Sequence, residues 1–176
     1  MEEAKKLERQ NRILQHLARI PRMMVYVHGR DDLSEFILHE LCSEECFNLR
    51  KAAYFVDNPD FNCLRGVAGF SSDETFKDIE KIWQEPETFS SFIIQAPFNN
   101  QVRSINFDSL LNKMSEQEVM REMAHRLGFT SCAHCSWNMR HDNHGILMYE
   151  KTDPSDTIVD DHIVDGMSLL NFCPIF

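Results

Sequence analysis

The sequence contains no apolar run near the roughly 20 residues that a membrane-spanning helix needs. Its charged N-terminus also lacks the apolar core of a signal peptide. Internal repeats and low-complexity segments are absent as well. These absences predict a globular cytoplasmic protein that makes no contact with a membrane.

Positive charge is scarce, because 18 Lys and Arg face 28 Asp and Glu, for a formal net charge of −10. Proteins bind nucleic acid largely by neutralising its phosphates with Lys and Arg. We therefore expect this chain to make no direct contact with nucleic acid.

The six cysteines are spread through a chain of 176 residues that is 43% apolar, which is ample for one domain with its own core. Such a chain does not depend on a disulfide framework, so we expect reduced thiols. Cys42 and Cys46 lie one helical turn apart and share a face. They form either a redox or metal pair or, in the simpler interpretation, two buried thiols that pack as small hydrophobic groups.

The first segment, residues 2–20, is charged and favours a helix that ends at Pro21. Its apolar stripe has heptad-like spacing and consists of Leu7, Ile13, Leu14, Leu17 and Ile20. Two interpretations remain open: a helix that lies on its own domain, and a helix that drives dimerisation. We therefore divide the chain into an N-terminal helix, residues 1–21, and a domain, residues 22–176.

Cap and turn residues predict the next elements. A second helix starts at Asp31 or Asp32, with Glu35 as the reciprocal capping residue, and reaches Phe47. Two strands, 52–57 and 61–70, form a hairpin around the turn Asn58-Pro59-Asp60. A helix capped by Ser71 or Ser72 follows and stops before Pro86.

The second half of the chain is predicted in the same way. Residues 89–96 are a candidate central strand and residues 101–107 a shorter strand. Ser115 and Glu118 form a capping box, with Met114 and Val119 placed as a hydrophobic staple, and Gly128 is the left-handed cap at the helix end.

A second hairpin, with strands 130–139 and 145–151, comes next, and Ser155 caps a final helix whose inner face is Val159, Ile163, Met167 and Leu170. The order of elements predicts an α+β fold, with one mostly antiparallel sheet of about five or six strands that helices flank.

Several short motifs resemble the GAF domain family of small-molecule sensors, which are related to PAS domains. The resemblance covers roughly residues 31–171. It is carried by Ala-Tyr-Phe-Val-Asp at 53–57, Leu-Arg-Gly-Val-Ala-Gly-Phe at 64–70, Leu-Gly-Phe-Thr-Ser at 127–131, Asn-His-Gly-Ile-Leu at 143–147, and Asp161.

The resemblance implies a ligand-binding sensory domain, of the kind used in signal transduction and transcription regulation, that acts as a homodimer or on a signalling partner or effector domain. The chain lacks the Asn-Lys-Phe-Asp-Glu signature of cyclic-nucleotide-binding members. Residues 97–130 also lack the cysteines of the methionine sulfoxide reductases of this fold. The resemblance therefore implies generic ligand sensing without catalysis, and the residues identify no cofactor.

In such a fold the ligand lies between one sheet face and the connection that follows the central strand. The expected site consists of Trp83, Phe92, Ile94, Arg103, Phe107, His134 and Trp137. Arg103 and His134 would form its polar end and favour a small anion or carboxylate, with Trp83 and Phe92 as apolar walls. The alternative interpretation is ordinary core for the aromatic residues and a solvated Arg103.

The four residues Cys132, Cys135, His141 and His144 have the side chains that zinc prefers. On a strand, residues 132 and 135 point to opposite faces, so we expect no joint zinc site. Cys132 and His134 do share a face, which leaves a thiol-dependent enzyme as an alternative function. A ligand-free dimerisation module with a filled interior is the other alternative.

Overall fold

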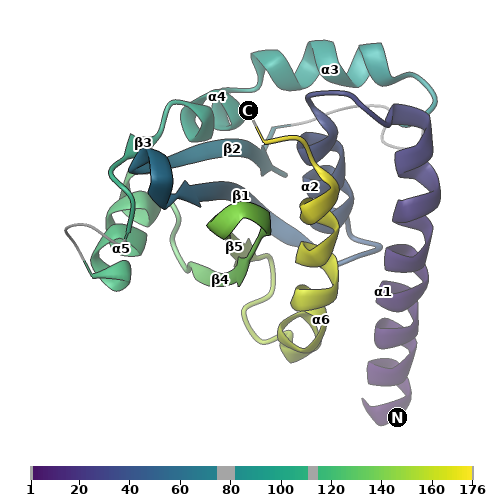
Figure 1. Cartoon of the computed structure of the whole chain (residues 1–176). Coiled ribbons are helices and arrows are strands. Elements are labelled where there is room, and N and C mark those ends of the chain that lie inside the picture. Colours follow the sequence, from purple (N-terminus) through teal and green to yellow (C-terminus); the bar gives the residue numbers. More distant parts are fainter. Residues whose placement is uncertain (1, 75–81, 111–114, 176) are drawn as a thin grey trace.

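The computed structural model describes residues 2–74, 82–110 and 115–175. These residues form an α+β fold around one antiparallel sheet of order β3-β2-β1-β5-β4, which confirms the predicted fold class (Figure 1). The strands are β1 Leu49–Asn58, β2 Cys63–Ser71, β3 Asn106–Phe107, β4 Ala133–Asn138 and β5 His144–Lys151. The helices are α1 Glu2–Met24, α2 Leu33–Cys42, α3 Pro86–Gln95, α4 Pro97–Arg103, α5 Glu116–Arg126 and α6 Thr157–Met167. No helix in the described residues is long and apolar enough to cross a membrane.

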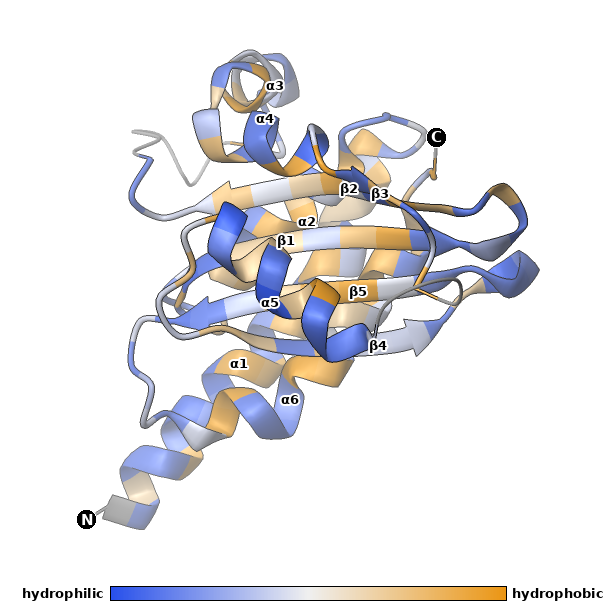
Figure 2. Ribbon diagram, turned by 90° about the vertical axis from the view of Figure 1, so that its left-hand side faces the viewer, coloured by the Kyte–Doolittle hydropathy of each residue, from blue (hydrophilic) through white to orange (hydrophobic). Residues whose placement is uncertain are grey.

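Helices cover both faces of the sheet, because alternate residues of each strand point to opposite sides. Tyr54 and Leu147 belong to the cluster that also contains the buried side chains of α1, α2, α3 and α6. Phe55 and Ile146 belong to a second cluster with α4 and α5. Figure 2 shows α5 across one face of the sheet and α2 behind it. Both faces of the central strands β1 and β5 are therefore buried.

Local turn and cap chemistry was predicted well. The Asn58 side chain accepts a hydrogen bond from the Phe61 amide and turns β1 into β2. Ser115 caps α5 by accepting from the Glu118 amide, and Gly128 adopts the left-handed conformation with φ of 63°. The second hairpin, β4 with β5, is confirmed. Met114, the proposed staple residue, lies outside the described residues.

Residues 89–96 are not a strand, because residues 89–95 form the last part of α3 and Ala96 is its C-cap. Pro86 occupies the first turn of this helix, where its missing amide costs no hydrogen bond. Phe89, Ile93 and Ala96 follow at helical spacing and are buried. The expected strand 101–107 is also wrong for its first part, which is the end of α4, and only Asn106 and Phe107 pair with β2.

Three helix boundaries also differ from the prediction. Helix α1 continues through Pro21 to Met24, because Ile20 is fully buried and Met23 and Met24 pack on the core. Helix α2 ends at Cys42 rather than Phe47. Asp156, one residue beyond Ser155, caps α6 by accepting from the Ile158 amide, while the inner face of α6 is buried as expected. Most of the helix expected before Pro86 lies outside the described residues.

Helix α4 lies directly on β2, and two glycines make this approach possible. A Cβ at Gly66 would be 1.9 Å from the Val102 carbonyl oxygen, and one at Gly69 would be 2.6 Å from a Val102 methyl. Asn99 on α4 completes the contact by accepting a 2.8 Å hydrogen bond from the Gly69 amide. The connection that follows α3 therefore closes this part of the sheet face.

We expect Gly66→Ala to lower the free energy of unfolding by about 3 kcal/mol, because the new methyl must push the α4 backbone off β2. The matched control is Gly29→Ala. Gly29 has open space around its Cβ position but a φ of 81°, so that variant should cost only about 1 kcal/mol. Urea denaturation of both variants measures the difference. Equal losses would show that α4 does not press on β2.

Candidate functional site

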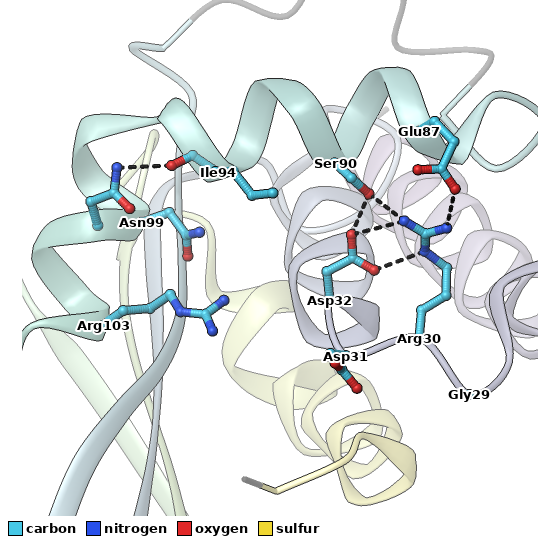
Figure 3. Close-up of a pocket in the computed structure, with 10 residues that line it drawn as sticks. Gly29, Arg30, Asp31, Asp32, Glu87, Ser90, Ile94, Asn99 and Arg103 are labelled. Carbon is cyan, nitrogen blue, oxygen red and sulfur yellow. Dashed lines mark hydrogen bonds and ion pairs between the residues drawn. The ribbon is translucent and has the colours of Figure 1, made fainter.

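A pocket of about 630 Å³ opens between α3, α4 and the segment that joins α1 to α2 (Figure 3). Its size is in the range of small-molecule sites. We call residues 29–32 the link, because they connect the short 3₁₀ turn Val25–Val27, which follows α1, to the first turn of α2. The pocket is lined by Gly29, Arg30, Asp31 and Asp32 of the link, Glu87, Ser90 and Ile94 of α3, and Asn99, Asn100 and Arg103 of α4.

Arg30 fastens the link to α3. Its guanidinium donates to Asp32 at 2.9 Å, to Glu87 at 2.6 Å and to the Ser90 hydroxyl at 2.7 Å. Hydrogen bonds to Asp32 and Glu87 raise the pKa of Arg30, so the charged form is held firmly. Ser90 in turn donates a short hydrogen bond to Asp32. Figure 3 shows the four side chains converging on one side of the pocket.

The local sequence explains this arrangement. Gly29 has a φ of 81°, which only glycine adopts readily, and it turns the chain between the 3₁₀ turn and α2. Asp32 occupies the N-cap position of α2, but its side chain makes no capping bond. The predicted cap of α2 is therefore wrong in its chemistry, because Arg30 and Ser90 engage the Asp32 carboxylate instead.

Arg103 lies on the opposite side of the pocket and is the polar residue that the sequence did predict. It donates to Glu35 of α2 at 2.8 Å. Glu35 is 1% exposed, so burial raises its pKa, while the contacts with Ser34 and Arg103 oppose that shift. Glu35 therefore pairs with Arg103 across the fold instead of capping α2. About half of the Arg103 side chain is exposed, which leaves other guanidinium donors facing solvent.

A second, smaller pocket of about 280 Å³ adjoins the first, since both are lined by Asp31 and Arg103. Arg65 of β2 also lines the smaller pocket. Within the described part of the chain, the side chains of Asp31 and Arg65 make no hydrogen bond or ion pair. The two pockets together therefore present one unpaired carboxylate and two guanidinium groups with unused donors.

The structure brings only two of the seven sequence-predicted site residues to this pocket, Ile94 and Arg103. His134 and Trp137 lie on β4, and β4 is separated from β2, against which α4 packs, by β1 and β5. At roughly 4.8 Å per strand this amounts to about 14 Å. Arg103 and His134 therefore do not share one cavity, contrary to the predicted polar end.

The remaining predicted residues have other contacts. His134 faces Glu116 at 3.8 Å, and Trp137 stacks on Tyr54 and donates to Asn171. The Arg126 guanidinium lies over the ring of Phe107. Phe92 of α3 is partly buried and packs against the core cluster. These aromatic residues follow the alternative interpretation, ordinary packing.

Trp83, an expected apolar wall, instead donates a 2.7 Å hydrogen bond to the buried Glu40 of α2. His16 of α1 lies 2.7 Å from the other Glu40 oxygen. Burial opposes ionisation of Glu40, but the contacts with His16, His39 and Trp83 outweigh it and lower its pKa to about 2. One carboxylate therefore connects α1, α2 and the turn before α3.

The cysteines give no sign of a reactive thiol. All six are free. Burial raises the pKa of Cys42 strongly and that of Cys46 to about 12, as for thiols that pack as hydrophobic groups. Cys132 is exposed to solvent on one side, yet its partial burial raises its pKa to about 11. A thiol with a raised pKa is a poor nucleophile at neutral pH.

Strand geometry separates the four residues considered for zinc. Cys135 packs with Trp137 against the cluster that holds α1, α2 and α6, whereas His134, whose face Cys132 was expected to share, points the other way toward Glu116 at the start of α5. Across residues 2–74, 82–110 and 115–175, no group of three His, Cys, Asp or Glu side chains could hold a metal ion. The absence of stoichiometric zinc stays a prediction.

Sequence reasoning missed Arg30, Asp31 and Ser90. The signal for the first two was a charged run directly after Gly29, which was used only as a helix start. Ser90 gave no signal, because residues 89–96 were expected in a strand.

Comparison with known proteins gives no identity. No protein-family model, curated protein or solved structure matches the chain. Its function is therefore inferred from the geometry of the pocket and of the contacts around it.

We expect the Glu40 carboxylate to stabilise the fold in a pH-dependent way. Its folded pKa of about 2 lies below the ordinary 4.5. Its contribution is therefore complete above about pH 5 and is lost as the pH falls toward 2, with a size of at most about 3 kcal/mol. Urea denaturation of wild type and Glu40→Gln should show a stability difference near neutral pH that shrinks with acidification. The exposed control Glu45→Gln should match wild type throughout, and a pH-independent Glu40→Gln deficit would contradict the assignment.

Proposed function

We propose that the chain is a GAF-like regulatory domain that binds a small molecule with a carboxylate, such as an α-amino acid, in the pocket beside the link. One observation carries the proposal. Asp31 and Arg103, of opposite charge, line both adjoining pockets, and Asp31 belongs to the link, the segment that joins α1 to α2. Arg103 suits a carboxylate, and Asp31 suits an ammonium group.

The link could carry a signal, because it lines the pocket and also leads into α1. A ligand carboxylate would compete with Asp32, Glu87 and Glu35 for the guanidinium groups of Arg30 and Arg103. A change in the Arg30 contacts moves the link, which leads directly into the 3₁₀ turn and α1. A small ligand would then alter how α1 lies on the domain, and a partner or effector domain would respond to α1.

The GAF likeness is part of this proposal. It is supported by the motifs named above and by the five-stranded antiparallel sheet with helices on both faces. The proposed site differs from the expected one. It lies between α3, α4 and the link, whereas the expected site lay between the sheet and the connection that covers it. The proposal places the domain in the cytoplasm, without catalysis and without direct contact to nucleic acid, in line with the raised pKa of Cys132 and the net charge of −10.

A second candidate, a ligand-free interaction module, is favoured by one observation. The close approach of Val102 to Gly66 and Gly69 fills the sheet face on which a sensor would be expected to hold its ligand. The two candidates differ in a single measurable property, which is whether the link pocket binds anything.

We expect at least one member of a panel of α-amino acids and short carboxylic acids to raise the melting temperature of the full chain. A ligand present at 100 times its dissociation constant stabilises by about 2.7 kcal/mol. Calorimetry of the best member should then show roughly 10- to 150-fold weaker binding in Arg103→Lys, which loses the paired donors of the guanidinium, and in Asp31→Asn, which loses the negative charge.

The matched control is His134→Ala, on the far edge of the sheet, which should bind as wild type does. If no panel member shifts the melting temperature, the ligand-free module is supported instead. If His134→Ala weakens binding while Asp31→Asn does not, the ligand lies elsewhere.

A further inference from the structure

Helix α1 carries two separate apolar faces. Ile13, Leu17 and Ile20 are buried against the domain. The other face of α1 carries Leu7, Asn11, Leu14, Ala18 and Pro21, and the same spacing continues to Val25 in the 3₁₀ turn. We call these six residues the outer stripe, and all six are exposed. Leu7 is 59% exposed, Leu14 41% and Val25 74%. The single stripe read from the sequence therefore divides between the domain and solvent.

The outer stripe has the spacing of a coiled-coil seam. Its members alternate at intervals of four and three residues from Leu7 to Val25, which is the a and d pattern of a heptad. Figures 1 and 2 show α1 at the margin of the molecule, with its N-terminal part projecting beyond the sheet. The N-terminal part of the stripe therefore stands clear of the chain's own domain, whereas Pro21 and Val25 lie beside Leu33 and Phe172.

Exposed apolar side chains stand at both ends of the stripe. Leu7 lies at one end, and Val25 and Tyr26, which is 76% exposed, lie at the other. Pro21 and Val25 also line a depression of about 180 Å³ together with Leu33 and Phe172. In an antiparallel pair Leu7 of each copy meets the Val25 end of the other, so one surface pairs with itself.

The charges beside the stripe also favour an antiparallel pair. Glu8 and Arg22 both flank the stripe on the side away from the domain, at equivalent heptad positions. When Leu7 of one copy faces Val25 of the next, Glu8 faces Arg22 twice and Gln15 lies near its own copy at the centre. A parallel pair would instead bring Glu8 next to Glu3 and leave Arg22 without a carboxylate.

We propose that the outer stripe binds a second copy of this chain in antiparallel orientation, held by two Glu8 to Arg22 ion pairs. This inference does not depend on the link pocket. In such a dimer the buried face of each α1 stays packed on its own domain. A movement of the link that shifts α1 in one copy would therefore also act on α1 of the second copy.

The test is sedimentation equilibrium of the full chain at micromolar concentrations, because a single helix contact lies at the small end of stable interfaces. We expect wild type to dimerise. Glu8→Arg and Arg22→Glu should each raise the dimer dissociation constant about tenfold, since each places two like-charge pairs in the interface. The double variant, Glu8→Arg with Arg22→Glu, should return to within about threefold of wild type.

Arg19→Glu, the same charge change at an exposed position of α1 outside the stripe and its flanks, should leave the dissociation constant near that of wild type. Circular dichroism confirms that the variants fold. A monomeric wild type overturns the proposal. A double variant that is as weak as, or weaker than, either single variant overturns the antiparallel orientation.

Discussion

Attachment of α1 depends on the buried carboxylate of Glu40. A carboxylate is stable inside a protein only when donors replace the water that it loses, and here His16 and the Trp83 indole do so from two other elements. Removing either donor would leave a buried charge partly unsatisfied, so the positions of α1, α2 and the turn before α3 are linked. Ile13, Leu17 and Ile20 add apolar contact but no such directional requirement.

The link connects this arrangement to the pocket. Arg30 holds the link on α3, and Arg103 holds α4 on α2, so the pocket is closed on two sides by ion pairs rather than by apolar packing. The pair between Arg30 and the exposed Glu87 is worth little and exchanges readily for a ligand's charges, whereas the Arg103 pair holds the buried Glu35 carboxylate. Both faces of β1 and β5, by contrast, are filled. The proposed response to a small molecule would therefore use contacts at the margin of the core.

The sequence could predict what local chemistry determines. Ser115, Gly128 and Asn58 cap or turn the chain with neighbours a few residues away, and those elements were predicted correctly. The predicted strand at residues 89–96 was wrong because a short buried apolar run fits a strand or a helix equally well. Only Pro86 and Pro97, each at the first position of a helix, indicated helices. The site could not be predicted, because Arg30 and Ser90 are 60 residues apart and meet only through the packing of α3 on the link.

We propose that the link transmits changes at the pocket to α1. Amide hydrogen exchange of Arg30→Ala, compared with Arg30→Lys and wild type, tests it most directly, because this substitution frees the link from α3 without touching α1. We expect faster exchange in residues 13–24 of Arg30→Ala, with β1 and β5 as protected as in wild type, and a smaller effect in Arg30→Lys. Unchanged protection of α1, or loss of protection in α1 and the sheet together, would contradict it.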